Sequence, residues 1–282
     1  NIPYGTWYVR EIEQPAGFVL DDTIYPVTIG ADGQVVEIEI VNRYVRGNIH
    51  LTKVDSEYPD NKLTGATFEV YKDSNANGKM DDGDELLGTL TEKEKGEYSM
   101  NDLFYGRYFV KETKAPEGFV LDTGVYEVMI DTNGKTYEVE NKAGVGFIND
   151  AMRGNLKIVK TSSDGKVKGF AFRITGANGY DIILETNDKG EIFIDGLRIG
   201  DYTISEVSNS ASSMYVIPAD KKATVKIGST TIVEMHNLLR DTPKTGDTTN
   251  LPLLYALAGL SAVGIAVCGV IGFKKKKKED RN

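Results

Sequence analysis

The sequence has one cysteine among its 282 residues, Cys268, which lies in a long apolar run near the C-terminus. The rest of the chain therefore has no disulfide, although extracellular domains are often held together by them. Only two histidines are present, and there is no Ser–His–Asp set, phosphate-binding loop or cysteine–histidine metal cluster. Because these motifs mark the common enzyme and zinc-protein classes, we expect a non-enzyme that requires no cofactor.

Helical patterning is also missing before residue 251. Short runs that alternate apolar and polar residues, such as TFEVYKD at 67–73, are separated by turn sequences such as DTNGK and NDKGE. Alternation with a period of two indicates strands, and short strands at regular spacing indicate β-sandwiches. The sequence therefore predicts an all-β chain of tandem immunoglobulin-like domains.

Positive charge is sparse outside the extreme C-terminus. The net charge is −9, and residues 274–282 contribute six positive and two negative side chains, so the remainder carries −13. An acidic surface repels nucleic acid, and so we expect no nucleic-acid partner.

Polar residues recur on strand faces that should be apolar. Three segments place a glutamate six residues after a glycine, and they run over 5–11, 106–112 and 200–206. Since side chains on alternate residues share a face, Glu112 lies on the same face as Tyr108 and Val110. Glu11 likewise shares its face with Trp7 and Val9, which we expect to face the interior, and Glu206 has equivalent neighbours.

Lysines and asparagines repeat in the same manner. RGNIHLTK at 46–53 returns as RGNLKIVK at 153–160, and each run ends in a lysine on the apolar face, Lys53 or Lys160. Three strand-like runs end in an asparagine: Asn42, Asn149 and Asn237. The repeat predicts the C-terminal part of a truncated module in 1–46, a complete module in 47–153 and a further module in 154–240. We call these the first, second and third modules, and any signal peptide is expected upstream of residue 1.

The modules resemble CnaB-like domains, also called SpaA-type prealbumin-like domains. The resemblance rests on an "E-box", YFVKETKAPEGF at 108–119 and YVREIEQPAGF at 8–18, whereas YTISEVSNSASSMYV at 202–216 keeps only the glutamate. It implies a spontaneous isopeptide bond between a first-strand lysine and a last-strand asparagine, assisted by the E-box acid. The implied sets are Lys53 with Asn149 and Glu112, Lys160 with Asn237 and Glu206, and Glu11 with Asn42, whose partner lysine is absent.

The residues supply a chemical reason for such a bond. Burial disfavours the charged forms of lysine and glutamate, so it promotes a neutral amine nucleophile and a protonated acid. The acid can then bind the carboxamide oxygen and transfer protons as ammonia leaves. An unreacted buried ion pair is the alternative, and Asn141 is a rival partner for Lys53. We favour Asn149 because its spacing to Gly154 equals that of Asn42 to Gly47.

One acidic loop has the spacing of calcium ligands. Oxygen-bearing side chains occupy positions 1, 3, 5, 9 and 12 of a loop with glycine at position 6; they are Asp73, Asn75, Asn77, Asp81 and Asp84. This order follows the calcium-loop pattern, although position 12 is normally glutamate. Calcium is a candidate ligand, and a solvated turn is the alternative.

The C-terminal residues have the most specific pattern. Residues 251–273 carry no charge, and a helix of this length, at about 1.5 Å per residue, spans the roughly 30 Å core of a bilayer. The lysine-rich tail at 274–282 should stay in the cytoplasm. Together with 241–250, this order resembles the cell-wall sorting signal that sortases cleave between Thr and Gly of Leu-Pro-x-Thr-Gly. The matching residues are Pro243, Lys244, Thr245 and Gly246, with Thr242 in place of the leucine.

The sequence therefore predicts a structural or adhesive cell-surface protein, either a pilin subunit or an adhesin stalk, with one C-terminal transmembrane helix. Its expected partners are a sortase, peptidoglycan or a pilin lysine as acceptor, a host extracellular ligand, and the membrane before sorting. Two alternatives stay open: the stalk of a surface enzyme whose catalytic domain lies upstream, and an uncleaved bitopic membrane receptor.

Overall fold

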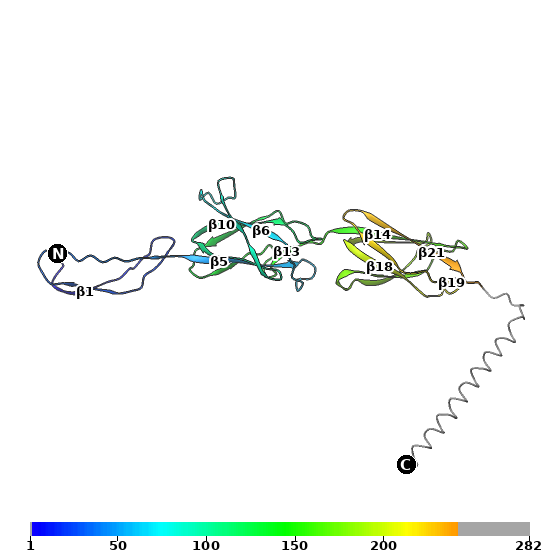
Figure 1. Cartoon of the computed structure of the whole chain (residues 1–282), viewed down its shortest axis with the longest axis horizontal. Coiled ribbons are helices and arrows are strands. Elements are labelled where there is room, and N and C mark those ends of the chain that lie inside the picture. Colours follow the sequence, from blue (N-terminus) through cyan, green and yellow to red (C-terminus); the bar gives the residue numbers. More distant parts are fainter. Residues whose placement is uncertain (1, 242–282) are drawn as a thin grey trace, which may run out of the picture.

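In the computed structural model, which describes residues 2–241, the chain forms three bodies arranged in a row (Figure 1). All regular structure in this range is strand except one short 3₁₀ turn at Ala177–Gly179. Over the same range no helix is long and apolar enough to cross a membrane. The predicted span at 251–273 lies outside the described residues.

The second module is a sandwich of two sheets, one antiparallel and one that also contains parallel pairs. One sheet has the order β11-β10-β6-β7, with strands Val125–Ile130, Gly106–Lys114, Thr67–Lys72 and Glu85–Thr89. The other has the order β12-β5-β9-β8, with strands Thr136–Glu138, Arg46–Asp55, Glu97–Phe104 and Thr91–Glu94. The last strand of the module, β13 (Phe147–Asn149), pairs with β5.

The third module repeats this plan. One sheet has the order β17-β14-β21-β19, with strands Glu191–Arg198, Arg153–Ser162, Thr230–Leu239 and Tyr215–Val216. The other has the order β16-β15-β18-β20, with strands Asp181–Glu185, Ala171–Thr175, Gly200–Val207 and Lys221–Val225. Each module thus places its glutamate strand (β10 or β18) and its lysine strand (β5 or β14) in opposite sheets.

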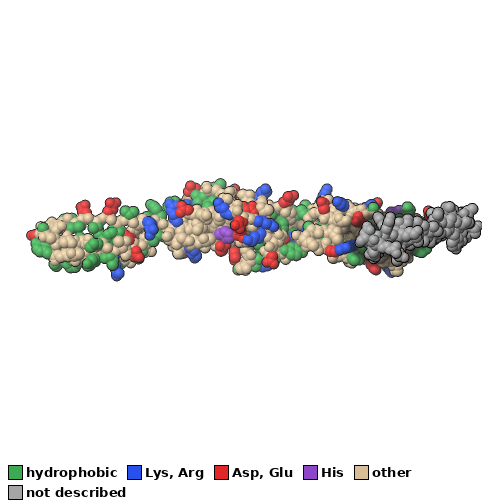
Figure 2. All heavy atoms as spheres, turned by 60° about the horizontal axis from the view of Figure 1, so that its bottom comes forward, with side chains coloured by type: hydrophobic (Ala, Val, Ile, Leu, Met, Phe, Trp, Pro, Cys, Tyr) green, Lys and Arg blue, Asp and Glu red, His purple; other side chains and the backbone are tan. Residues whose placement is uncertain are grey.

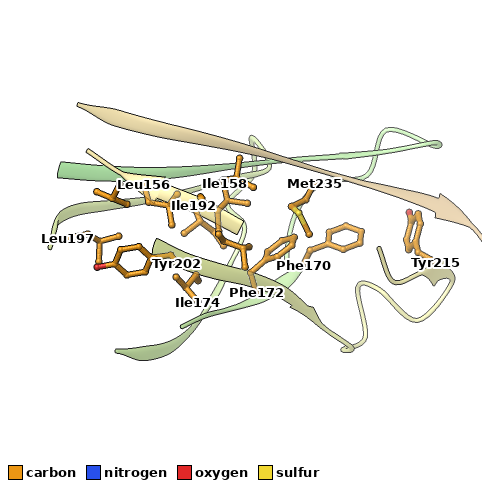
Figure 3. Close-up of a cluster of buried hydrophobic side chains, with 14 residues drawn as sticks. Leu156, Ile158, Phe170, Phe172, Ile174, Ile192, Leu197, Tyr202, Tyr215 and Met235 are labelled. Atoms are coloured by element: carbon orange, nitrogen blue, oxygen red, sulfur yellow. The ribbon is translucent and has the colours of Figure 1, made fainter. Parts of the chain in front are cut away.

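A hydrophobic core fills the space between the sheets of each complete module. In the third module, Phe170, Phe172 and Ile174 point toward Ile158 and Met235 from the facing sheet (Figure 3). The alternation of buried and exposed residues along β14 and β21 matches the period of two expected from the sequence. The prediction of an all-β fold is confirmed for the described residues.

The first module has no comparable core. Its strands are β1 (Gly5–Val9), paired with β3 (Tyr25–Ile29), and β2 (Phe18–Val19), paired with β4 (Arg43–Tyr44). Trp7 and Val9 were expected to face an interior, but their exposed fractions are 43% and 38%. Figure 2 shows hydrophobic side chains gathered over this end of the molecule.

A predicted strand in the first module is also absent. Residues 38–42, expected to form a strand ending at Asn42, have no regular structure. In the complete modules the asparagine strand is hydrogen-bonded to the lysine strand. The described part of the first module has no lysine strand, so these residues lack the backbone partner that a strand requires.

Candidate functional site

The first and last strands of each complete module run side by side in parallel. In the second module Lys53 is opposite Phe147, and Asn149 lies two residues further along β13. In the third module Lys160 is opposite Met235, and Asn237 again lies two residues further along. A two-residue step covers about 6.6 Å and returns to the same face, a distance that an extended lysine side chain can reach.

This pairing buries both lysines and both asparagines. Lys53 and Lys160 are 0% and 1% exposed, although lysine is almost never fully buried unless it is paired. Asn149 and Asn237 are 3% and 0% exposed. The Lys53 ammonium nitrogen, Nζ, donates to the carbonyl oxygen of Phe147 at 3.0 Å, which holds it on the strand that carries Asn149.

The facing sheet brings the predicted acid to each asparagine. Glu112 on β10 is 0% exposed, and its Oε2 accepts a hydrogen bond from Asn149 Nδ2 at 2.9 Å. In the third module Glu206 on β18 is 7% exposed, and its Oε1 accepts from Asn237 Nδ2 at 2.6 Å. Lysine, asparagine and glutamate therefore meet in one buried cluster in each complete module, in the sets that the resemblance to CnaB-like domains implied.

Burial moves the pKa values of these groups toward their neutral forms. Desolvation lowers the pKa of Lys53 to about 8, against the attraction of the Glu112 charge. Desolvation also raises the pKa of Glu112 above its usual value, although the Asp122 amide and Asn149 donate hydrogen bonds to the carboxylate. The same cause lowers the pKa of Lys160 and raises that of Glu206. A neutral amine beside a protonated acid is the state that acyl transfer from the asparagine requires.

The hydrogen bonding at these clusters is incomplete in the same way in both modules. Within residues 2–241, the buried side-chain oxygens and nitrogens that lack a partner are Glu112 Oε1, Asn149 Oδ1, Glu206 Oε2 and Asn237 Oδ1. Buried polar atoms are nearly always paired, so an unpaired atom needs an explanation. A proton on each glutamate supplies a donor, and each asparagine oxygen is an acceptor that lacks one.

The first module keeps the glutamate–asparagine half of the arrangement. Asn42 Nδ2 donates to Glu11 Oε1 at 2.6 Å, and the backbone amide of Asp21 donates to Glu11 Oε2 at 2.7 Å. The equivalent bond in the second module runs from the Asp122 amide to Glu112 Oε2 at 2.8 Å. Both members of the first-module pair are partly exposed. The acid and the amide therefore associate without the lysine.

An aspartate that the sequence analysis missed supports the second cluster. Asp122 Oδ2 accepts hydrogen bonds from Tyr126 at 2.8 Å and from Asn141 Nδ2 at 2.6 Å. Asp122 also contributes to the charge near Lys53. The signal was present in the sequence, because GFVLD followed by tyrosine four residues later occurs at both 17–25 and 118–126.

The rival asparagine is occupied elsewhere. Besides its bond to Asp122, Asn141 exchanges two hydrogen bonds with the backbone of Ile148, at 2.6 and 2.9 Å. Asn149, by contrast, has its amide against Glu112 and its oxygen unpaired. This geometry favours Asn149 over Asn141 as the partner of Lys53.

The predicted calcium residues lie in the loop between β6 and β7. Asp73 accepts hydrogen bonds from the backbone amides of Asn77 and Gly78, at 3.1 and 3.0 Å. Asp81 accepts side-chain bonds from Asn75 and Asn77, and Asp84 accepts the Asp81 amide at 2.9 Å. Within residues 2–241, no three His, Cys, Asp or Glu side chains converge as metal ligands. Calcium binding here stays a prediction.

The predicted sortase residues, Pro243 to Gly246, lie outside the described residues. The structure therefore describes the two lysine–asparagine–glutamate clusters and the E-boxes. The sorting signal stays a prediction from the sequence.

Comparison with known proteins agrees with the repeat seen in the fold. The SpaA prealbumin-like fold domain matches residues 1–44, 47–143 and 154–238. The chain belongs to the SpaA prealbumin-like family. The three matches correspond to the three modules, and the first match covers the segment that has no lysine strand.

This SpaA chain is similar to parts of two longer proteins. The trypsin-resistant surface T6 protein of Streptococcus pyogenes serotype M6 is 26% identical over 194 residues, which cover 58% of this chain and 34% of that protein. The structure of the Bacillus anthracis TIE protein is 26% identical with a TM-score of 0.62, and the match covers 85% of this chain and 42% of that one. The chain thus spans less than half the length of either relative.

Proposed function

We propose that this chain is a covalently cross-linked stalk of a sortase-anchored cell-surface protein, either a pilin subunit or an adhesin. The observation that carries the proposal is the buried lysine–asparagine–glutamate cluster, which occurs in the same register in two successive modules. A relative that is by name a surface protein supports the location.

The proposed reaction joins the lysine and asparagine of each module. The neutral amine of Lys53 attacks the side-chain carbonyl carbon of Asn149, and a carbon–nitrogen bond forms. Glu112 moves the proton lost by the amine to the departing nitrogen, because it already contacts Asn149 Nδ2. The products are one amide and one ammonia, and no oxidant or cofactor is consumed. Lys160, Asn237 and Glu206 carry out the same reaction in the third module.

The position of the bond gives it a mechanical role. Tension enters the third module at the start of β14 and leaves at the end of β21, and these strands pair in parallel from Asn155–Thr230 to Ser162–Asn237. An amide between Lys160 and Asn237 would pass the load directly from one strand to the other. The long segment between them, which includes most of the core, would then carry no tension. The module would resist unfolding under force because its covalent path bypasses its hydrogen bonds.

The test is the intact mass of the full 282-residue chain, purified in detergent. We expect a deficit of two ammonias, one for each complete module, with one deficit lost in Glu112→Gln and the other in Glu206→Gln. Glu127→Gln, at an exposed position on the edge strand β11 next to β10, is the matched control and should keep both deficits. The unreacted mass in the parent chain would refute the cross-links.

Anchoring is tested separately in cells. Sortase attachment predicts that the protein fractionates with the cell wall and that Thr245→Ala releases it to the membrane fraction. A bitopic receptor would remain in the membrane fraction with or without this substitution.

A further inference from the structure

The Pro–x–Gly–Phe turn that ends the E-box is not needed by the cross-linking chemistry. It occurs at 15–18 and 116–119, and in both copies the phenylalanine amide donates to the proline carbonyl at 3.1 Å. Gly17 and Gly118 have φ of 84° and 83°, in the left-handed region that favours glycine. The two turns therefore have the same shape, and both lie where one module meets the next (Figure 1).

Each turn begins a chain of two backbone hydrogen bonds that ends on the following module. Val45 donates to the Gly17 carbonyl at 2.8 Å, and Tyr105 of the second module donates to the Val45 carbonyl at 3.0 Å. At the next junction Met152 donates to Gly118 at 2.8 Å, and Ile199 of the third module donates to Met152 at 3.0 Å. Two junctions with different side chains share one backbone connection.

The donor on the following module is also equivalent in both junctions. Tyr105 and Ile199 each immediately precede the glycine that starts the glutamate strand, Gly106 or Gly200. The turn of one module therefore contacts the turn that leads into the E-box strand of the next.

Side chains reinforce the first junction by aromatic packing. The rings of Phe18 and Tyr44 are 4.7 Å apart, and Tyr44 contacts Phe104 of the second module edge-on at 5.4 Å. Arg46 covers the Phe104 ring at 3.8 Å.

The second junction has an arginine at the position of Phe104. Arg198, one residue before Ile199, donates to both carboxylate oxygens of Asp55 at 2.5 and 2.7 Å and to Glu57 at 2.7 Å. Asp55 is fully buried, and the Arg198 side chain is 15% exposed. Arg198 also lies 5.9 Å from the Phe119 ring. A buried bidentate pair fixes geometry as well as charge, so it holds the third module in one orientation on the second.

The third module differs at this point. It has no Pro–x–Gly–Phe sequence, and the corresponding aromatic residue, Tyr215, is 2% exposed. Its ring lies beside Phe170 at 5.2 Å, and its hydroxyl donates to Asp164 at 2.6 Å, so it points into its own core (Figure 3). In the second module the aromatic residue is half-buried and reaches Arg198 of the next module.

We propose that the Pro–x–Gly–Phe turn is a coupling surface whose partner is the turn before the glutamate strand of the following module. It makes consecutive modules a rigid unit. The third module lacks the Pro–x–Gly–Phe sequence and its partly exposed phenylalanine, although the Arg240 amide donates to the Met214 carbonyl at 2.9 Å, as the equivalent amides do in the other modules. The coupling does not depend on the isopeptide bonds.

The experiment measures the distribution of distances between modules by single-molecule FRET on the full chain in detergent. Cys268→Ser removes the native thiol, and Lys93→Cys and Lys222→Cys place dyes at exposed strand positions in the second and third modules. We expect one narrow distribution for this parent. Phe119→Ala combined with Arg198→Ala should widen it about twofold or more, as for modules joined by a free linker.

Arg173→Ala is the matched control, because Arg173 forms a bidentate pair with Asp181 and both residues belong to the third module. It should leave the distribution unchanged. Arg198→Gln alone, which removes the ion pairs but keeps the turn, should give an intermediate width. A double variant as narrow as the parent, or a parent as broad as the double variant, would overturn the coupling. The ammonia deficits measured on the same samples report the cross-links independently.

Discussion

Replacing Lys53 with methionine gives the sharpest prediction for the second module. Methionine has a similar length and is apolar, so the variant leaves no unpaired buried charge at this fully buried position. It removes only the amine that would form the bond. Any loss of stability then comes mainly from the missing cross-link rather than from a cavity or a buried ammonium.

The magnitude follows from the loop that the bond closes. Lys53 and Asn149 lie on the first and last strands of the module, so the amide closes a loop of about 100 residues. The chain-entropy relation for cross-links assigns about 4.7 kcal/mol to a loop of this length. For a domain of about 100 residues, 1 kcal/mol shifts the melting temperature by roughly 4–8 °C. We therefore expect Lys53→Met to lower the melting temperature of the second module by about 20–40 °C.

Differential scanning calorimetry of the full chain, paired with intact mass, measures this effect. Lys62→Met is the matched control, because Lys62 is half-exposed and forms an ion pair with Glu97. A surface pair contributes about 0–1 kcal/mol, so the control should shift the same transition by only a few degrees. A Lys53→Met protein that loses one ammonia deficit but melts within a few degrees of the parent would refute the entropic reasoning. One that keeps both deficits would refute Lys53 as the nucleophile.

Three further outcomes are expected. The rate of bond formation on refolding should be bell-shaped in pH, because the reactive form of the Lys53–Glu112 pair holds one proton, with the amine neutral and the acid protonated. The rate should rise as the pair loses its first proton, near the raised pKa of Glu112, and fall above about pH 8, the pKa of Lys53, as the pair loses its second. A rate that keeps rising through pH 9 would contradict this assignment. Asn149→Ala should abolish the second-module mass deficit, whereas Asn141→Ala should retain it; the reverse result would transfer the bond to Asn141. Thr245→Ala should prevent linkage to the wall, seen as loss of the protein from the wall fraction on immunoblots, and unchanged linkage would exclude the predicted cleavage site.

The glutamate strand β10 shows which buried positions can be predicted from the sequence. Alternation placed Tyr108, Val110 and Glu112 on one inward face, and all three are at most 1% exposed. The same reasoning was wrong for Trp7 and Val9, because alternation identifies which residues share a face and does not show whether another sheet covers that face.

The hydrogen bonds of Asn141 and Asp122 could not be predicted from strand alternation. Both residues lie in segments without regular strand structure, where no periodicity fixes side-chain direction. The hydrogen bond between them joins residues that are 19 apart in the sequence. Only the repeat of GFVLD at 17–21 and 118–122 could have pointed toward Asp122.

The sequence by itself determined the all-β class, the module boundaries to be tested and the types of residue at the site, because strand periodicity and repetition are local properties. The tertiary structure decided that the lysine and asparagine strands pair in parallel, with each asparagine two residues beyond the residue opposite the lysine. It also decided that the glutamate faces them from the other sheet. The tertiary structure also decided the contact between the second and third modules at Arg198, whose carboxylate partners lie more than 140 residues earlier in the chain. Contacts of this range depend on how sheets and modules pack, and no local pattern encodes them.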